Sequence, residues 1–600
     1  MQIPTPRYLV QSTYIIGTIP NRSRFGEHCK IMWQQILDPM GSLWLSAFIA
    51  SLPIFFLFIA LAVLRMKGHF AALGALAIAA LLACTAFKMP VSLAAAAVLD
   101  GACFGLFPIG WIIFSAVFLH RITDHTGQFD ALKRSVASLT DDRCTQGILV
   151  AFSFGALVEA CAGFGAPVAI SAGILAGLGF PLLEAAEICL VANTAPVAFG
   201  SIGIPIITAA QISGVDQMAI SQMVGRQLPI ISLVVPFYLV WLLGKREGLR
   251  KTWAPALVSG AAFAITQWWS ANYLGPTLPD ILSAIASIVA LALFLMWRRR
   301  KTHIPATAHE QRDILFGWSP FIVVCIVMII WALPSVKALL DVTMIKFAVP
   351  LLHNAVTSAQ DGKAIAAEYK FNWLSASGTA LFLAALSTAL TQRIPLRTLV
   401  SILGETFVKL RLPLVTVAAL LGYAYLGNFS GMTITLGNFF AQSGKLFPLF
   451  APVIGWIGVF ITGSDTSSNA IFGKLQAVTA EKLGLDPVLT VAANASGGVA
   501  GKMVSPQSIA VATAATGLTG QEALLFRRTI AHSLLLLSII MMITWAQATM
   551  LPWMIPNSHG ATVVQTATAG SYALPLAYLA LGATLSGGVL MAARRHSASS

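Results

Sequence analysis

The chain has 600 residues, of which 57% are hydrophobic and only 10% are charged, and its formal net charge is +14. A soluble protein carries about 25% charged residues, so this composition excludes the soluble globular class. Apolar runs close to the ~20 residues that span a bilayer recur along the chain, and the basic residues cluster in short tracts between them. This is the positive-inside pattern. We therefore expect contact with a lipid bilayer and not with nucleic acid.

The beginning of the chain differs from the rest. Residues 1–31 are polar and irregular and make a poor signal peptide. We interpret them as an N-terminal extension and leave open whether they are translated, with Met32 as the alternative start. The connections between the later apolar runs are too short to hold cores of their own. Residues 32–600 are therefore predicted to form a single membrane domain.

The first unusual stretch covers residues 155–208, which read GALVEACAGFGAP and then VANTAPVAFGSIGIP. Glu159 is the only charged residue between Cys144 and Leu183. A charge at the bilayer centre costs about 2.5–3.5 kcal/mol, and glycine and proline free backbone groups that must find partners there. We predict broken or re-entrant helices here, with Glu159 as a proton-carrying carboxylate. The alternative is a structural carboxylate bonded to the backbone at the break.

Uncharged polar residues mark the breaks as well. Asn193 and Thr194 lie in the first stretch, and Asn494 and Ser505 lie in comparable positions further on. Such groups can hold a substrate or ion in secondary transporters, so all four are candidate substrate ligands. The alternative is that they hold neighbouring helices together. Glu187, between these motifs, is expected on a solvated face.

The second unusual stretch covers residues 461–512 and includes GSDTSSN. Asp465 is its first charged residue and a second candidate for the proton-coupling role. Short polar side chains surround it, as in a hydrated site for a hydroxylated anion or a cation, and the candidate ligands among them are Ser464, Thr466, Ser468 and Asn469. The same residue types are also good helix N-caps, and both roles can coexist because a helix N-terminus favours anions.

Lys502 is the only cation between Asp486 and Glu522. It is a candidate partner for a substrate carboxylate, and the alternative is a lysine that snorkels to the membrane interface. The glycines before it do not match a phosphate-binding loop. The seven cysteines show no metal-binding or disulfide spacing. We expect no cofactor, no metal and no enzymatic active site.

These features together predict an all-α polytopic membrane protein with about 12–16 transmembrane segments. Paired broken segments in two halves of a membrane protein indicate a transport site. Residues 191–214 resemble residues 491–517 in their small residues, their asparagine and their late proline. This similarity predicts an internal repeat, with an inverted arrangement as the expected form.

The chain resembles the lactate permease family, and the resemblance extends from Met32 to about residue 592. It is carried by five segments: MWQQILDPMGSLWLSA (32–47), GALVEACAGFGAPVAI (155–170), VANTAPVAFGSIGIPI (191–206), ITGSDTSSNAIFGKLQ (461–476) and NASGGVAGKMVSPQSIAVA (494–512). It implies uptake of L-lactate, D-lactate and glycolate with protons across a bacterial inner membrane. It also implies inverted repeats, re-entrant hairpins and an elevator-like movement, and it leaves a homodimer open.

Our hypothesis is therefore secondary active transport of a small 2-hydroxy monocarboxylate together with a proton by the 32–600 transport domain. Lys502 or the helix N-termini would hold the carboxylate, and Glu159 or Asp465 would carry the proton. Two alternatives stay open. One is an intramembrane enzyme that uses Asp465 and Glu159 as paired carboxylates, and the other is a carboxylate transporter coupled to sodium.

Overall fold

The computed structural model describes residues 32–64, 66–137, 139–161, 166–298, 308–360, 362–518 and 521–556. This part of the chain is mostly helical, which confirms the predicted fold class. It contains nine helices that are long and apolar enough to cross a membrane, or up to eleven if each bent helix pair is one span. Residues 1–31 and the apolar run 573–592, which was counted among the predicted crossings, lie outside the described residues.

In the N-terminal part of the chain, the first two long helices lie at the periphery of the molecule. In the span Gly68–Thr85 only 28% of residues are buried in the protein, against 94% in Arg143–Cys161. The outer surface of the peripheral span is therefore left for lipid. This part comprises β1 (Trp33–Gln34), α1 (Leu43–Phe58), η1 (Ile59–Val63), α2 (Gly68–Thr85), α3 (Val91–Phe104), η2 (Gly105–Gly110), α4 (Trp111–His125) and α5 (Gln128–Ala137).

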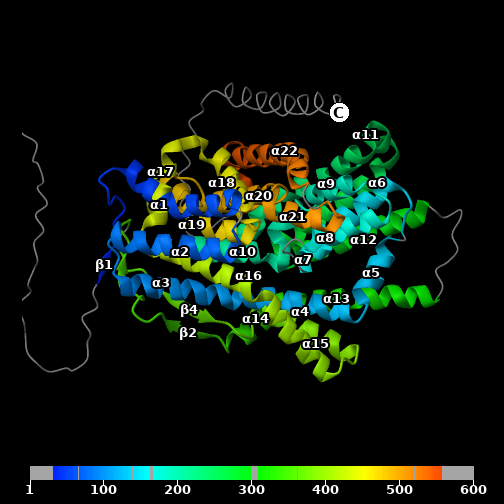
Figure 1. Ribbon diagram of the computed structural model, residues 1–600, viewed down its shortest axis with the longest axis horizontal. Coiled ribbons are helices and arrows are strands. Elements are labelled where there is room, and N and C mark those ends of the chain that lie inside the picture. The colour runs from blue at the N-terminus through cyan, green and yellow to red at the C-terminus, as the bar shows by residue number, and fades with distance from the viewer. Residues whose placement is uncertain are drawn as a thin grey trace, which may run out of the picture.

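The first broken stretch lies inside the helical body (Figure 1), and one of its helix pairs is bent, as predicted. The helix that carries Glu159 is buried on all sides, which explains why Glu159 is its only charged residue. Two helices further on, Leu182–Ala192 and Val197–Ser213 meet at a bend of 65°. The elements are α6 (Arg143–Gln146), η3 (Gly147–Phe154), α7 (Gly155–Cys161), α8 (Ala166–Gly177), α9 (Leu182–Ala192), η4 (Val197–Phe199) and α10 (Gly200–Ser213).

The middle of the chain joins the two broken stretches. Its longest helix, α11, is interrupted at Lys245, where the backbone leaves the helical conformation. The count of nine to eleven spans treats α11 as one span, although its two halves are separated by this break. The predicted total of about 12–16 crossings therefore stays a prediction. The elements are α11 (Gln217–Tyr273), α12 (Pro279–Arg298), α13 (Ala308–Ala332), α14 (Pro334–Asp341), β2 (Ile345–Ala348), β3 (Val356–Thr357), β4 (Glu368–Phe371) and α15 (Ser377–Thr391).

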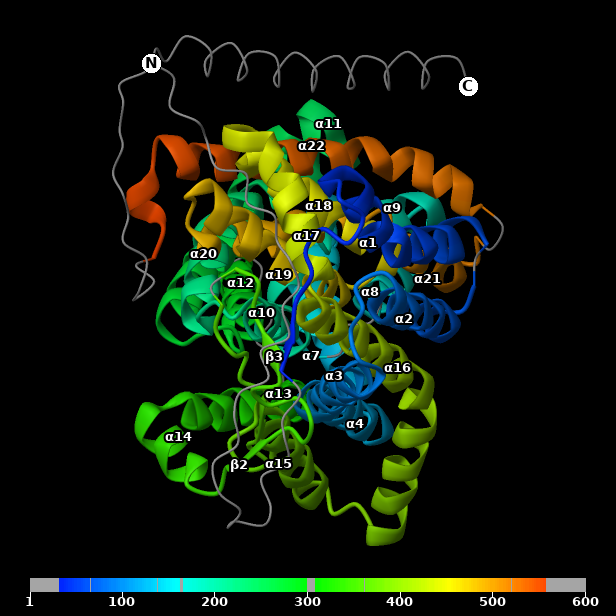
Figure 2. The same ribbon diagram turned by 90° about the vertical axis from the view of Figure 1, so that its left-hand side faces the viewer.

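The strands form two small sheets at the edge of the helical body. β1 pairs in parallel with β3, and β2 pairs antiparallel with β4, in the register Ile345 to Phe371. β2, α14 and α15 lie along one edge of the molecule, and α22 lies along the opposite edge (Figure 2). The strands therefore do not contribute to the buried polar centre.

The second broken stretch packs against the first. Within the second half itself, small residues let the helices approach closely, because a Cβ added at Gly497 would lie 2.1 Å from the carbonyl oxygen of Pro452 on the helix Phe447–Thr462. The elements are α16 (Leu396–Ser430), α17 (Met432–Phe440), η5 (Ala441–Leu446), α18 (Phe447–Thr462), α19 (Asp465–Leu483), α20 (Pro487–Lys502), α21 (Pro506–Thr516), α22 (Glu522–Thr549) and η6 (Pro552–Met554).

The packing between the two stretches is reciprocal. The last helix of the first stretch, α10, packs against α19, the second helix of the second stretch. Conversely α21, the last helix of the second stretch, packs against α8, the second helix of the first. Two structural repeats related by a two-fold axis would pack in this way. The inverted orientation of the predicted repeat stays a prediction.

Candidate functional site

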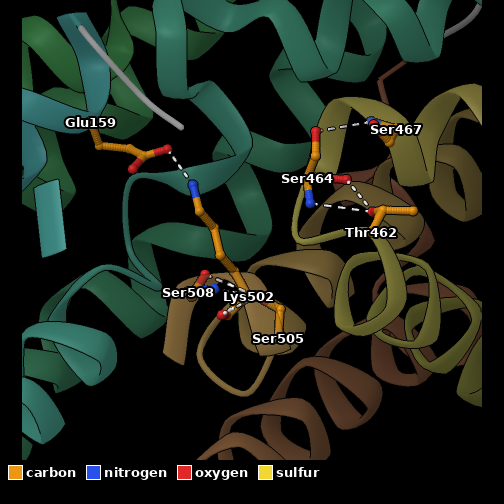
Figure 3. A network of polar contacts seen from close by, with 7 residues as sticks. All are labelled: Glu159, Thr462, Ser464, Ser467, Lys502, Ser505 and Ser508. Atoms are coloured by element: carbon orange, nitrogen blue, oxygen red, sulfur yellow. Dashed lines mark hydrogen bonds and ion pairs between the residues drawn. The ribbon is translucent and has the colours of Figure 1, made fainter. Parts of the chain in front are cut away.

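The two broken stretches meet in one buried ion pair. Lys502 lies at the end of α20 and its Nζ donates to Oε1 of Glu159 on α7 at 2.6 Å (Figure 3). The side chains are 9% and 3% exposed, respectively. This burial argues against a snorkelling lysine. The second oxygen of Glu159, Oε2, is buried and has no hydrogen-bond partner in the described part of the chain.

An unusual backbone segment faces Glu159. A Cβ at Gly200 would lie 2.8 Å from Glu159 Oε1, so glycine leaves the space that the carboxylate occupies. The three residues that follow, Ser201, Ile202 and Gly203, have left-handed backbone angles, with φ values of 46°, 61° and 74°. Only glycine adopts this conformation readily. A β-branched residue such as Ile202 is held there by its surroundings, and such strain is typical of functional sites.

Lys502 also faces a small closed space beside the ion pair. The side chains of Asn193 and Thr194 come from the end of α9, and Ser508 comes from the start of α21. The remaining walls are Val168, Leu190, Val499 and Met503. Both the oxygen and the nitrogen of the Asn193 amide are buried without a hydrogen-bond partner in the described residues. Unpaired buried amides cost free energy, and a ligand that pairs with this amide would recover it.

Asp465 is the second predicted acid, and it is buried to 3% exposure at the first position of α19. Neither of its carboxyl oxygens makes a hydrogen bond that meets ordinary geometric limits within the described chain. Its electrostatic partners are Lys502, Asn469 and Glu159. A Cβ at Gly498 would lie 2.3 Å from Asp465 Oδ1, so a glycine again makes room for a carboxylate.

Two of the predicted hydroxyl ligands near Asp465 make hydrogen bonds within the protein. Ser464 is the N-cap of α19 and accepts a hydrogen bond from the backbone N–H of Ser467. With Thr462 these residues form a group that is separate from Lys502 and Glu159 (Figure 3). Ser468 donates to the carbonyl of Gly455. These bonds match the capping and packing alternatives.

The two predicted asparagines of the second stretch bind each other. Asn494 donates to the side-chain oxygen of Asn469 at 2.8 Å, and it accepts from Gln476 at 3.1 Å. Asn469 in turn donates to the carbonyl of Pro205, which links α19 to α10. In this conformation the network matches the alternative of polar contacts between helices.

The other predicted ligands at the breaks lie close to Lys502. The Ser505 hydroxyl caps α21 and donates to the Lys502 carbonyl and to Ser508. The Thr194 hydroxyl donates to the Val191 carbonyl. Thr466 is half-buried on α19.

Two residues at this centre were missed by the sequence analysis. Ser508 lines the space beside Lys502. Asp280, the second residue of α12, is 1% exposed, and both of its carboxyl oxygens lack a hydrogen-bond partner in the described structure. Its electrostatic partners are Glu159 and Lys502. Asp280 directly precedes an apolar run, so a search for isolated acids at helix starts would have found it.

The prediction for Glu187 was wrong. Its side chain is 12% exposed and accepts hydrogen bonds from Arg528 at 3.0 Å, with His532 at 3.2 Å from its other oxygen. His532 also lies 2.5 Å from the hydroxyl of Tyr238. The cluster joins α9, α11 and α22, so Glu187 belongs to a contact between helices. The sequence did not predict this contact because the partners of Glu187 are more than 300 residues away along the chain.

A large cavity of about 1180 Å³ lies next to the buried centre. Its walls include Ala169, Ser464 and Gln507. Their sequence neighbours Val168 and Ser508 line the small closed space by Lys502. Because α8 and α21 pack against each other, the two helices form the wall between the large cavity and the small space.

These features define a multi-pass membrane protein with a buried, charged polar centre between broken helices. Among the described residues no group of histidine, cysteine and acidic side chains is arranged to hold a metal ion. The family model described as L-lactate permease matches residues 46–551. The chain belongs to the lactate permease family.

Curated relatives support the same assignment. The chain is 47% identical to the L-lactate permease of Bacillus subtilis over 88% of this chain and 100% of the relative. It is 46% identical to the glycolate permease GlcA of Escherichia coli over 86% of this chain and 98% of the relative. The L-lactate permease of Escherichia coli is 44% identical, with 88% and 100% covered. These relatives are bacterial, which fits the predicted bacterial inner membrane.

A solved structure, that of the YdaH transporter of Alcanivorax borkumensis, aligns with a TM-score of 0.40 and 14% identity. The alignment covers 75% of this chain and 87% of that one.

Proposed function

We propose that this protein takes up L-lactate, and also D-lactate and glycolate, in symport with protons. Membership of the lactate permease family and the names of the relatives support the substrates. The observation that carries the mechanism is the buried ion pair between Lys502 and Glu159 beside an unpaired Asn193 amide. Assembly as a homodimer is part of the proposal and rests on the family resemblance alone.

The ion pair provides a direct link between substrate and proton. The Lys502 ammonium is the cation at the centre, and in this conformation Glu159 occupies it. A substrate carboxylate needs the same ammonium. When Glu159 takes up a proton, it no longer competes, and Lys502 is free for the substrate. Protonation of Glu159 and substrate binding therefore favour each other, which is the thermodynamic condition for coupling.

Charge balance at the ion pair favours a ratio of one proton to one substrate anion. The empty centre holds one ammonium and one carboxylate, so the pair is neutral. If an anionic substrate entered alone, the centre would carry a net negative charge inside the membrane, which is costly. If the substrate enters with one proton, which binds Glu159, the centre stays neutral. The pair thus explains the expected coupling of one proton to one carboxylate.

The groups around the small space suit the rest of the substrate. The Asn193 amide offers both a donor and an acceptor, and the Ser508 side chain lines the same space. A 2-hydroxy acid presents a carboxylate and an adjacent hydroxyl that these groups can bind. The space is closed in this conformation, so entry requires α8 and α21 to separate toward the large cavity.

The test is lactate transport by the purified protein in proteoliposomes. We expect radiolabelled L-lactate to accumulate when an inward proton gradient is imposed, to emerge chemically unchanged, and to do so when choline replaces sodium. Accumulation that required sodium would favour the sodium-coupled alternative. Chemical conversion of lactate would favour the enzyme alternative.

Glu159→Gln tests the role of the carboxylate. The variant leaves Lys502 without a competing anion, so lactate exchange between the two sides should persist while accumulation driven by the proton gradient is lost. Glu481→Gln is the matched control, because Glu481 is exposed on α19, and it should behave as the unaltered protein. Normal coupled uptake by Glu159→Gln would remove Glu159 from the proton role.

A further inference from the structure

Asp280 is a buried acid that has no role in the proposed replacement of Glu159 by substrate on Lys502. It lies in the first turn of α12, is 1% exposed, and has two carboxyl oxygens without a hydrogen-bond partner in the described chain. An ionised carboxylate in such a place has neither water nor a donor to stabilise it. Asp280 therefore holds a proton in this conformation.

The position of Asp280 is tied to that of Glu159. The turn before α12 packs on the left-handed segment of α10, and a Cβ at Gly203 would lie 2.3 Å from the Pro276 carbonyl oxygen. The same segment of α10 begins at Gly200, which lies against the Glu159 carboxylate. One strained turn thus contacts both the start of α12 and the carboxylate that pairs with Lys502.

The charged groups around Asp280 are few. The elements packed against α12 are α7, α10, α11 and η3. α7 contributes Glu159 and Cys161, both of which interact electrostatically with Asp280, while α10 and η3 contain no titratable residue. On α11, Arg226 is hydrogen-bonded to Asn272 and to the Met554 carbonyl. The titratable residues of α11 (Arg226, Tyr238, Lys245, Arg246, Glu247, Arg250, Lys251 and Tyr273) are not among the electrostatic partners of Asp280 in the described chain.

The two unpaired acids of the centre differ in their strongest charged neighbour. For Asp280 that neighbour is Glu159, whereas for Asp465 it is Lys502. Two carboxylates that interact in this way are not both ionised, because like charges at short range inside a protein repel strongly. Asp280 therefore keeps its proton while Glu159 is ionised on Lys502. The same burial holds for Asp465, whose two carboxyl oxygens also have no hydrogen-bond partner in the described chain.

We propose that Asp280 is the proton donor to Glu159 in the transport cycle, an inference that rests on the proposed proton symport. In the empty centre Glu159 is ionised on Lys502 and Asp280 is protonated. When the substrate carboxylate binds the Lys502 ammonium, the proton moves from the Asp280 carboxyl to the Glu159 carboxylate. Asp280 then takes a new proton from the solution to which the centre is open. One proton enters per substrate anion, and no other reactant is needed.

The experiment compares Asp280→Asn with the unaltered protein in proteoliposomes. Asparagine has nearly the same shape but has no carboxyl proton to give, so Glu159 should stay on Lys502, and lactate exchange, lactate-driven proton uptake and accumulation should all fall. The double variant Glu159→Gln, Asp280→Asn has no anion that competes for Lys502 and should regain exchange without accumulation. Asp280→Glu should restore accumulation. The matched control is Asp486→Asn, because Asp486 caps α20 through the Val488 N–H and asparagine is an equally good cap.

The outcomes separate this inference from the proposed function. If the unaltered protein does not couple lactate to protons, the proposed function fails. If it does, and Asp280→Asn accumulates lactate with the same proton stoichiometry and pH dependence, Asp280 is not the donor. Failure of the double variant Glu159→Gln, Asp280→Asn to regain the exchange that Glu159→Gln shows also overturns the inference, because Asp280 would then be required for binding or folding.

Discussion

The two broken stretches interrupt their helices in different ways. In the second stretch each helix that follows a break has a side-chain N-cap, Ser464 for α19, Asp486 for α20 and Ser505 for α21. In the first stretch, α10 begins without a side-chain cap, and its first turn contains three left-handed residues. The second stretch therefore caps its own helices, whereas the uncapped turn of the first lies tightly against Pro276 and Glu159.

This difference shows how the polar residues of the two stretches are divided between structure and function. Hydroxyls and amides of the second stretch are largely occupied by caps and by contacts between helices. In the first stretch Asn193 is unpaired and faces Lys502. We infer that the second stretch supplies a firm frame and the cation, and that the first supplies the mobile proton and the free polar groups.

The largest effect is expected from breaking the ion pair that joins the two stretches. Lys502→Met leaves Glu159 buried without a cation, and removal of one partner of a buried pair costs about 3–5 kcal/mol. The double variant Glu159→Gln, Lys502→Met should recover most of this stability but no transport. Unfolding of the purified variants and lactate uptake are the measurements. A double variant as unstable as the single one would show that the pair is not the source of the loss.

The next effect concerns the strained turn of the first stretch. Gly203→Ala places a Cβ at a left-handed position and 2.3 Å from the Pro276 carbonyl, which should destabilise the protein by about 2–5 kcal/mol. Gly173→Ala is the control, since a Cβ at Gly173 meets nothing within 4 Å, and it should stabilise helix α8 by about 0.5–1 kcal/mol. Equal stability of the two variants would contradict the described turn.

Substitution of one asparagine in each stretch tests the difference between the stretches directly. Asn494→Ala removes hydrogen bonds to Asn469 and Gln476 and should cost about 1–3 kcal/mol of stability. Asn193→Ala removes no hydrogen bond of the empty protein, so stability should be kept while the KM for lactate rises roughly 10–100-fold. Thermal unfolding and uptake kinetics distinguish the two. The comparison is refuted if Asn193→Ala is the less stable variant and its KM is unchanged.

The smallest effect is expected at Ser464. Ser464→Ala removes the cap of α19 and should cost about 1 kcal/mol with little change in lactate uptake. Ser464→Asn should restore the cap and the stability. A large rise in KM for both variants would instead make the hydroxyl a substrate ligand, as the sequence predicted.

The composition and local motifs were sufficient for the class of fold. Runs of apolar residues, isolated charges and clusters of glycine and proline determine where a chain can cross a bilayer and where its helices must break. The breaks after Ala192, Thr462 and Lys502 follow from these local patterns. The resemblance to the lactate permease family was also visible in short segments, because each contains many matching residues in sequence.

The use of each polar side chain was decided by tertiary packing. Glu159 and Lys502 are 343 residues apart. The sequence predicted a proton carrier in the first and a ligand for the substrate carboxylate in the second, but it did not show that the two side chains are in contact. Asp280 entered the centre because α12 packs against α7 and α10. Ser464 is a cap because the chain turns there, whereas Ser468 donates to the Gly455 carbonyl of the neighbouring helix. Local sequence sets which backbone groups need partners, but only the packed helices determine which side chains are left free for a substrate and a proton.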